Sequence, residues 1–462
     1  MMDISAAARA LGGRLLGAPA VEAPPVVFGE VSTDSRRIGK GALFVALRGE
    51  KFDGHDFVDT AAAQGAAAAL VDEAAAARWQ QPPLPLIVVA DTRRALGALA
   101  ADWRARFTLP LIALTGSNGK TTTKEMIAAI LRAAYGDTVL ATVGNLNNDI
   151  GLPLTLLGLR ATHRAAIVEL GMNHPGEIAA LAAIARPTVA LVTNAQRAHL
   201  EGMGSLDAIA EEKGTIYDGL GADGIAVVNA DEPWADLWRA RARRVLGFGL
   251  EQPADVAGSC RLHGLDNHLT LSFQGERGEV ELCLPGRHNA RNALAAAAAT
   301  LAAGVPFAAV CAGLAAFRGA PGRLQKKAAI GGATLLDDTY NANPDSVRAA
   351  IDVLSATVGR QILVLGDMGE IGEMSGQFHD EIGGYAKSQG IDRLFALGEA
   401  SALAAHNFGA GGRHFRRVDE LVAALKHELT PETTVLVKGS RFMRMERVAD
   451  AIAAPATAAE VH

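Results

Sequence analysis

The sequence contains few cysteines and few aromatic residues. Its 462 residues include three cysteines, and Phe, Trp and Tyr together make up 5%. The thiols, Cys260, Cys283 and Cys311, are scattered, odd in number and without CxxC spacing. This pattern argues against a disulfide framework and a cysteine zinc site. It predicts a protein of the reducing cytoplasm.

Long apolar segments are also lacking. Asp3 and two arginines interrupt residues 1–16, so this stretch has no signal-peptide core, and we expect an amphipathic surface helix. Residues 292–317 carry no charge, but they are mostly alanine, and Gly-Val-Pro at 304–306 divides them. Alanine inserts weakly into bilayers and proline breaks helices, so the sequence predicts two buried helices and no membrane span.

Strong charge of one sign is absent as well. The formal net charge is -6, with 49% hydrophobic and 20% charged residues. This composition is typical of a globular protein and gives no electrostatic reason to bind nucleic acid. Any polyanionic ligand must therefore be held by local groups. The length suggests roughly three domains.

Apolar runs alternate with helix-forming segments along the whole chain, which predicts the α/β class. We expect an N-terminal α/β substrate domain at 1–107, a central domain at 108–320 and a C-terminal Rossmann-like ligand domain at 321–462. The strand-like runs of the first two domains lie at 41–47, 66–71, 84–90, 164–169, 188–193 and 224–229. The central sheet should be mostly parallel, with an added antiparallel hairpin at 269–284.

The C-terminal domain has four strand-like runs that each end in polar residues. They lie at 333–336, 361–365, 393–397 and 434–437. Ligands of open α/β sheets bind outside the carboxyl ends of the strands. We therefore expect these polar ends to face one crevice.

The most informative motif is TGSNGKTT at residues 115–122, which follows an apolar run and opens a helix-forming segment. A strand, a glycine loop and a helix N-terminus together bind nucleotide phosphates, which predicts ATP or GTP as ligand. Lys120 should contact the outer phosphates and Thr121 should ligate Mg²⁺. The amides of the whole loop should hold phosphate oxygens: Gly116, Ser117, Asn118, Gly119, Lys120, Thr121 and Thr122. An ordinary glycine turn is the alternative, and Leu114 stands where the usual motif begins with glycine.

Other polar residues permit two interpretations each. Glu169 ends a strand-like run, which suits a metal-binding acid or a solvated charge. His199 follows another run, and a lone histidine is more often structural. Lys213 lies in a helical pattern that predicts an ordinary solvated lysine. The amides of Asn145, Asn147 and Asn148 suit a polar substrate, although such clusters also form turns.

Eight motifs in order resemble the Mur ligases over essentially the whole chain. They are TGSNGKTTTKEM, GNLNNDIGLPLTLL, VELGMNHPGEI, TNAQRAHLEGMGS, PGRHNARNALAA, DDTYNANPDS, LGDMGEIGEMS and VKGSRFMRME. TGxxGKT and HNxxN mark the superfamily, whereas DDTYNANPDS and LGDMGEIGEMS resemble the branch that adds D-alanyl-D-alanine. The DNPR motif of a sibling branch is absent, and Ala-Gln-Arg at 195–197 departs from the usual family residues.

The resemblance implies an ATP-dependent, cytoplasmic enzyme of peptidoglycan synthesis, and we expect a monomer. Its substrates would be UDP-N-acetylmuramoyl-tripeptide and D-alanyl-D-alanine, with ATP and two Mg²⁺ ions. It implies catalytic roles for Lys120, Glu169, His199 and Lys213, with Thr121, Glu169, His199 and a carbamylated Lys213 around the metal ions. Asn292, Arg323 and Asp338 would contact ATP, and Thr33, Asp34, Ser35 and Arg36 would contact the uridine nucleotide. Asn341, Asn343 and Arg441 are candidates for the dipeptide.

Two rival functions stay open from the sequence. A sibling ligase would add a single amino acid instead of a dipeptide. A P-loop NTPase switch would hydrolyse ATP without any acceptor, although no arginine-finger or switch pattern is recognisable.

Overall fold

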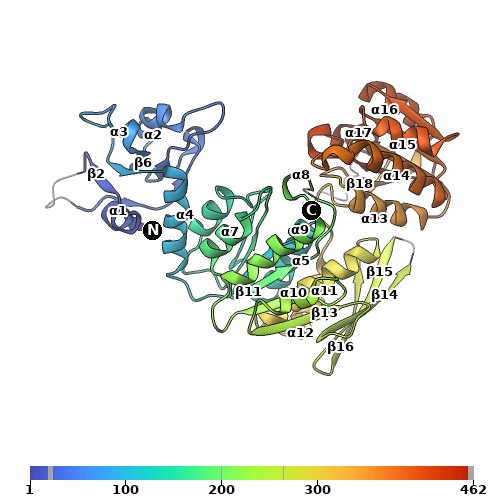
Figure 1. Ribbon diagram of the computed structural model, residues 1–462, viewed down its shortest axis with the longest axis horizontal. Helices are drawn as coiled ribbons and strands as arrows, with labels where there is room; N and C mark the ends of the chain where they lie inside the picture. Colours follow the sequence, from blue (N-terminus) through green and yellow to red (C-terminus); the bar gives the residue numbers. More distant parts are fainter. Residues whose placement is uncertain (19–23, 199, 264, 456–462) are drawn as a thin grey trace.

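The computed structural model describes residues 1–18, 24–198, 200–263 and 265–455. It contains three large sheets that follow one another along the chain, of five, nine and six strands. Figure 1 shows the first and third sheets with their helices on either side of the central one. The three sheets with their helices form the first, central and third domains, and they confirm the predicted α/β class.

The first domain has the sheet order β2-β7-β6-β5-β4. The predicted runs at 41–47, 66–71 and 84–90 contain its buried strands β5, β6 and β7. The N-terminal helix is also present, and the Asp3 carboxylate accepts a hydrogen bond from its first turn. The elements are β1 (Met2–Asp3), α1 (Ile4–Leu11), β2 (Arg14–Leu16), β3 (Val27–Phe28), β4 (Val31–Ser32), η1 (Ser35–Arg37), β5 (Leu43–Val45), η2 (Gly54–Phe57), α2 (Val58–Ala63), β6 (Ala68–Asp72), α3 (Glu73–Ala76) and β7 (Leu86–Val89).

The central sheet has the order β16-β15-β14-β13-β12-β11-β8-β10-β9. Pairing is parallel from β9 through β14 and antiparallel between β14, β15 and β16, which confirms the predicted mixed sheet and its hairpin. The strands are β8 (Leu111–Thr115), β9 (Val139–Ala141), β10 (Ala165–Glu169), β11 (Val189–Val192), β12 (Ile225–Asn229), β13 (Arg244–Gly249), β14 (Val256–His263), β15 (Asp266–Phe273) and β16 (Glu276–Leu282).

Helices cover both faces of this sheet. All five residues of β8 are buried, as expected for a central strand with helices above and below. The charge-free segment forms the helix pair α11 and α12, as predicted. In the described residues no helix is long and apolar enough to cross a membrane. The helices are α5 (Lys120–Tyr135), α6 (Gly151–Leu157), α7 (Glu177–Ala185), α8 (Leu200–Met203), α9 (Leu206–Gly214), η3 (Thr215–Gly219), α10 (Ala235–Arg239), α11 (Arg287–Ala302) and α12 (Phe307–Ala316).

The third domain has the sheet order β17-β18-β22-β19-β20-β21, and only β17 in this sheet pairs antiparallel among the described residues. All four predicted strands are present. The elements are β17 (Gln325–Ala328), η4 (Ile330–Gly332), β18 (Thr334–Asp338), α13 (Pro344–Ser355), β19 (Arg360–Gly366), η5 (Gly372–Met374), α14 (Ser375–Ser388), β20 (Arg393–Leu397), α15 (Ser401–Phe408), β21 (Gly412–Phe415), α16 (Val418–Lys426), β22 (Thr433–Lys438), η6 (Arg441–Met443) and α17 (Glu446–Ile452).

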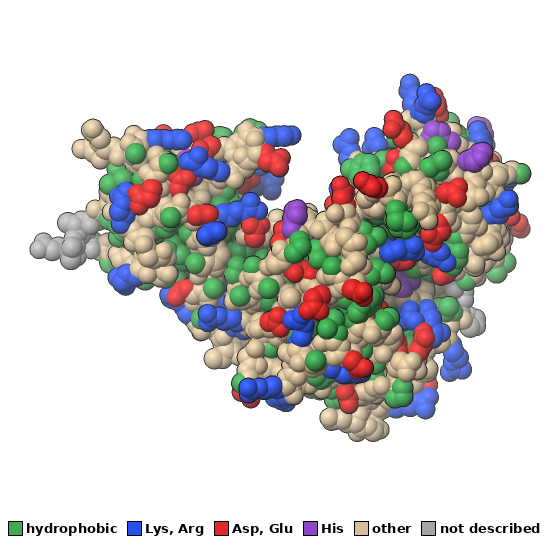
Figure 2. Space-filling view, in the orientation of Figure 1, with side chains coloured by type: hydrophobic (Ala, Val, Ile, Leu, Met, Phe, Trp, Pro, Cys, Tyr) green, Lys and Arg blue, Asp and Glu red, His purple; other side chains and the backbone are tan. Residues whose placement is uncertain are grey.

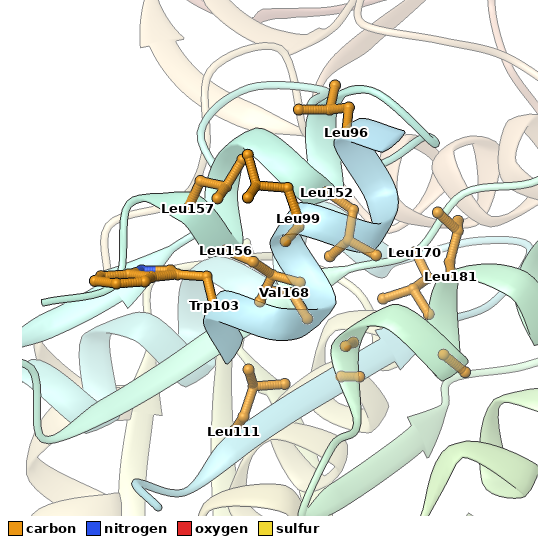
Figure 3. Close-up of a cluster of buried hydrophobic side chains, with 14 of the residues drawn as sticks. Leu96, Leu99, Trp103, Leu111, Leu152, Leu156, Leu157, Val168, Leu170 and Leu181 are labelled. Atoms are coloured by element: carbon orange, nitrogen blue, oxygen red, sulfur yellow. The ribbon is translucent and has the colours of Figure 1, made fainter. Parts of the chain in front are cut away.

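Helix α4 (Thr92–Arg104) joins the first domain to the central one. Its buried hydrophobic side chains belong to one cluster that also contains residues of β5, β6, β8, α6 and α7. Figure 3 shows Leu96, Leu99 and Trp103 of this helix facing leucines of α6 and the strand residue Val168. The Trp103 Nε1 also donates to the Leu159 carbonyl at 3.1 Å. The first domain is therefore anchored to the central sheet by an apolar contact.

This anchor predicts a large stability effect for Leu99→Ala. Leu99 is fully buried, so the change should lower the free energy of unfolding by about 3 kcal/mol through lost burial and a residual cavity. Urea denaturation followed by tryptophan fluorescence measures this, because Trp103 lies in the same cluster. Leu403→Ala is the control, since Leu403 is 43% exposed. Equal losses in both variants would contradict the assigned packing.

Candidate functional site

The glycine loop between β8 and α5 has no room for larger residues. Gly116 and Gly119 have φ angles of 154° and 79°, which L side chains rarely adopt. A Cβ at Gly116 would lie 1.8 Å from Thr193 Oγ1, and one at Gly119 would lie 2.3 Å from Asn292 Oδ1. Glycine at both positions lets the backbone pack tightly around the N-terminus of α5. This is the strand, loop and helix arrangement that the sequence predicted for phosphate binding.

The segment after β11 holds this loop in place. The Ser117 and Asn118 amides donate to the Asn194 carbonyl and side-chain oxygen at 3.0 and 2.9 Å. The Gln196 amide donates to Ser117 Oγ at 2.9 Å, and Asn118 Nδ2 donates to Gln196 Oε1 at 2.6 Å. Asn194 and Gln196 were not among the predicted site residues. The polar run directly after a buried strand was the signal for them.

Two cations converge on the loop. Lys120 Nζ donates to the Gly116 and Ser117 carbonyls at 2.7 and 3.3 Å. Arg323 of the third domain donates from Nη2 to Thr121 Oγ1 at 3.2 Å, and its guanidinium stacks 3.9 Å from the Tyr340 ring centroid. Among the described residues neither cation forms an ion pair, and the buried Arg323 Nε has no hydrogen-bond partner. This is a site that an anion would complete.

The pKa of Lys120 is consistent with an anion-binding site. Burial lowers the pKa of its ammonium group, and the Arg323 charge lowers it further, while Glu169 and Glu370 raise it. An anion bound between Lys120 and Arg323 would relieve their mutual repulsion. The two side chains come from different domains, so a bound polyanion would also hold the third domain to the central one.

Glu169 is not the solvated strand-end charge of the alternative interpretation, because it is 2% exposed. Its Oε1 accepts from Asn147 Nδ2 at 2.9 Å, whereas its Oε2 has no partner among the described residues. A buried, half-satisfied carboxylate that lines the same cavity as Thr121 suits a hard cation such as Mg²⁺. Groups of three or more His, Cys, Asp or Glu side chains do not converge anywhere in the described part of the chain. Further ligands would therefore come from phosphate and water.

Lys213 differs most from its pattern-based interpretation. The lysine at the end of α9 is 1% exposed, so it is not a solvated surface charge. No hydrogen bond or ion pair to its Nζ is formed within the described residues. Burial and the nearby Lys120 charge lower the pKa of the amine well below its usual value, against the opposing effect of Glu212. This environment therefore shifts the Lys213 side chain towards the neutral amine. His199 lies outside the described residues.

A cavity of about 800 Å³ opens beside the loop. The central domain contributes the loop, Asn147, Asn148 and Glu169 to its lining, and the third domain contributes Arg323 and residues 340–343. Figure 2 shows the surface hollowed between the first and third domains. The size suits a nucleotide with part of a second substrate.

Three of the four polar strand ends of the third domain meet at this cavity. They follow β18, β22 and β19, and contribute Tyr340, Lys438 and Glu370 to the lining. Lys438 Nζ donates to Asp338 Oδ2 at 2.5 Å and to the Asn341 carbonyl at 2.9 Å. The fourth end, after β20, does not line it. There the amides of residues 399–401 donate to the Asp367 carboxylate.

The remaining predicted residues divide between two locations. Asn292 contacts the loop glycine, and Asn343 caps α13 while its Nδ2 donates to Asn118 Oδ1 at 2.7 Å. Outside the cavity lie Arg441, paired with Glu446, and the first-domain turn at 33–36. In that turn the Arg36 guanidinium donates two hydrogen bonds to Asp34 and the Arg36 amide donates a third, and these contacts lower the pKa of Asp34 to about 2. Asn145 is exposed and also outside the lining. Asp338 is outside the lining too, but it is partly buried.

One wall of the cavity could not be found from the sequence. Arg93 at the start of α4 forms an ion pair with Asp149, and both line the cavity together with His174 and Glu177. Arg93 and Asp149 are 56 positions apart. No local pattern indicates such a pair, which forms because α4 packs on the central domain.

Three comparisons with known proteins agree with this geometry. Residues 28–104 match the Mur ligase family catalytic domain, residues 114–300 the Mur ligase middle domain, and residues 322–441 the Mur ligase glutamate ligase domain. Among curated proteins, the UDP-N-acetylmuramoyl-tripeptide–D-alanyl-D-alanine ligase of Escherichia coli K12 is 43% identical over 96% of each chain. The Bacillus subtilis 168 ligase of the same name is 35% identical over 90% of this chain and 92% of its own.

Solved structures show the same architecture. A crystal structure of MurF from Acinetobacter baumannii has a TM-score of 0.88 and 36% identity, covering 97% of this chain and 98% of its own. MurF from Thermotoga maritima, solved in complex with ADP, has a TM-score of 0.81 and 26% identity, covering 92% and 97%. The three-domain arrangement predicted from the sequence is thereby confirmed.

A carboxyl group beneath the loop gives a testable pH dependence. The side chain of Glu232 accepts from the Ala195 amide at 3.1 Å, and burial raises its pKa to about 7. The folded state thus holds this proton more tightly than the unfolded state. Stability should fall as pH rises from the ordinary glutamate range to about 7, because the unfolded chain loses its proton first.

Glu232→Gln should therefore stabilise the protein at pH above that interval. Glutamine keeps an acceptor oxygen for Ala195 without the buried charge. We expect a gain of at most about 3 kcal/mol near pH 8 that shrinks towards pH 5, measured by urea denaturation. Glu420→Gln is the control, because the Glu420 side chain is 57% exposed. A gain independent of pH would show that the buried charge is not its cause.

Proposed function

The chain belongs to the Mur ligase family, and on that premise we propose that it joins D-alanyl-D-alanine to UDP-N-acetylmuramoyl-tripeptide with ATP. The observation that carries the proposal is that Lys120 and Arg323 lack ion-pair partners among the described residues and lie near the half-satisfied carboxylate of Glu169. The named relatives over nearly the whole chain support the choice of substrates. The product would be the pentapeptide precursor of peptidoglycan, made in the cytoplasm.

The reaction needs two transfers in a site that excludes water. The terminal carboxylate of the tripeptide attacks the γ-phosphorus of ATP, which forms an acyl phosphate and releases ADP. The neutral amine of the dipeptide then attacks the acyl carbon, and inorganic phosphate leaves with formation of the amide bond. In the first step a carboxylate approaches a polyphosphate, so positive charge must be concentrated where the anions meet.

The chain's own groups suit this requirement. Lys120 lies at the loop carbonyls with its ammonium group close to the cavity, and Arg323 brings a second charge from the third domain. The loop amides from Gly116 to Thr122 would hold the phosphate oxygens. Asn292 would contact the adenine. Asp338, which orients Lys438 and accepts from the Leu324 amide, would contact the ribose.

Thr121 and Glu169 are the described residues that would hold Mg²⁺, and His199 is the expected ligand of a second ion. Bound Mg²⁺ would neutralise part of the phosphate charge. The unpaired Glu169 Oε2 supports this role, because burying a carboxylate oxygen without a partner is unfavourable unless a ligand completes it.

Lys213 is proposed to carry a carbamate. In its neutral form the buried amine can attack CO₂ and lose one proton, which turns a potential cation into a carboxylate-like anion near Lys120. An anion suits a site of cations and metal ions, whereas an ammonium group would repel them. The lowered pKa of Lys213 supports this step, since only the neutral amine is nucleophilic.

The division of tasks among domains is proposed as 1–107 for the uridine nucleotide, 108–320 for ATP and 321–462 for the dipeptide. Residues 33–36 would contact the nucleotide, with Asn145, Asn147 and Asn148 nearer the peptide. Asn341, Asn343 and Arg441 are the dipeptide candidates. Arg441 is exposed and within 5.9 Å of the Tyr340 ring centroid, so it borders the cavity wall without lining it. We expect the enzyme to act as a monomer.

A coupled assay tests the function directly. Release of phosphate from ATP, with UDP-N-acetylmuramoyl-tripeptide present, should require D-alanyl-D-alanine and yield one amide bond per ATP. Single amino acids, including D-alanine, should support little turnover. Preference for a single amino acid would favour a sibling ligase. Equal ATP hydrolysis without any acceptor would favour a P-loop switch.

The carbamate can be tested by a spectroscopic signal in addition to activity. The protein equilibrated with ¹³C-labelled bicarbonate should give a carbamate ¹³C NMR signal that disappears in Lys213→Ala. Lys426→Ala is the control, because Lys426 is an exposed lysine near the end of α16. Full activity of Lys213→Ala, or a signal that persists in it, would contradict the assignment.

A further inference from the structure

Four charged side chains form a cluster that joins the central and third domains beside the phosphate loop. Arg197, which follows β11, donates from Nε and Nη2 to Asp345 Oδ1 at 3.0 and 2.6 Å. Its Nη1 donates to Glu381 Oε2 at 3.3 Å, and Arg348 Nη1 donates to Glu381 Oε1 at 2.6 Å. The central domain contributes Arg197 alone to this cluster, and the other three belong to α13 and α14.

Solvent reaches these charges only in part. The exposed fractions of the Arg197, Asp345 and Glu381 side chains are 23%, 24% and 32%. The Arg197 guanidinium also lies 5.3 Å from the Phe378 ring centroid. Partly desolvated ion pairs with two hydrogen bonds stabilise a contact more than exposed ion pairs, which contribute little free energy. The cluster can therefore contribute to the relative position of the central and third domains.

Asp345 also binds the main chain of the opposite domain. Its Oδ2 accepts from the Arg197 amide at 2.8 Å. Asp345 lies in the first turn of α13, two residues after the cap Asn343, whose Nδ2 donates to Asn118 of the phosphate loop at 2.7 Å. On the other side, Gln196 precedes Arg197 and binds Ser117 and Asn118. The start of α13, the 194–197 segment and the phosphate loop thus form one connected network.

We propose that Arg197 is a positioning residue, whose contacts with Asp345 and Glu381 seat the third domain on the phosphate loop. The same seating brings Arg323 to Thr121. Arg197 itself does not line the cavity, so it acts through the placement of α13 and Arg323. Without it, the third domain would sit less often over the loop. The consequence for catalysis rests on the proposed ligase function, but the seating does not.

Small-angle X-ray scattering of the substrate-free protein tests the seating. Arg197→Ala should increase the radius of gyration, whereas Arg417→Ala should not, since the ion pairs of Arg417 stay within the third domain. Asp345→Asn should also expand the protein, and the double variant should add little to either single change. Fully additive expansion, or none in Arg197→Ala, would overturn the proposal.

A measurement without substitutions covers the case in which a variant does not fold. Raising salt from about 0.05 M to about 0.5 M should expand the wild-type protein, because salt screens partly exposed ion pairs. An unchanged radius of gyration over this range would contradict the proposal that ion pairs hold the third domain on the phosphate loop.

The catalytic arm measures ADP formed per amide bond. A loosely seated third domain should admit water to the acyl phosphate, so Arg197→Ala should raise this ratio severalfold, with a higher KM for the dipeptide. Arg197→Lys should restore part of the coupling. Expansion with an unchanged ratio would overturn the positioning role. A wild-type protein that makes no amide bond would contradict the proposed function instead, while the scattering result would still decide the seating.

Discussion

The tight packing around two loop glycines is the constraint on which the site depends. Thr193 packs against Gly116 and Asn292 packs against Gly119, so the phosphate loop has no space for a side chain at either position. After the next strand, Asn194 accepts from the Asn118 amide and Gln196 accepts from the Asn118 side chain. Because the fold already holds the phosphate loop, a ligand need not order it, which lowers the entropic cost of binding.

Charged groups without ion-pair partners among the described residues surround the phosphate loop, and they favour a polyanion as ligand. The Arg323 charge lowers the pKa of Lys120, the Lys120 charge lowers the pKa of Lys213, and Glu169 keeps one buried oxygen without a partner within the described chain. Such groups destabilise a protein unless a ligand compensates them. Their location at the junction of two domains means that the same ligand would bring those domains together. The same charges thus influence both ligand binding and the position of the third domain.

Much of this could be predicted from the sequence because the signals were local. Strand alternation, the charge-free helix pair and TGSNGKTT each depend on neighbouring residues, and all three have the predicted structure. Partners distant in sequence could not be predicted: Arg93 with Asp149, or Arg197 with Asp345, 148 positions apart. Lys213 shows the limit most clearly. Its helical pattern indicated a solvated lysine, and only the tertiary packing of α9 buries it.

The central claim is that this site directs a peptide carboxylate, rather than water, to the γ-phosphate of ATP. Positional isotope exchange tests it most directly, with ATP carrying ¹⁸O in the β,γ-bridge. With UDP-N-acetylmuramoyl-tripeptide and no dipeptide, reversible acyl phosphate formation predicts that the label moves to non-bridging positions of the β-phosphate. Without the tripeptide no exchange should occur. Absence of exchange with the tripeptide, together with steady ADP production, would contradict the account.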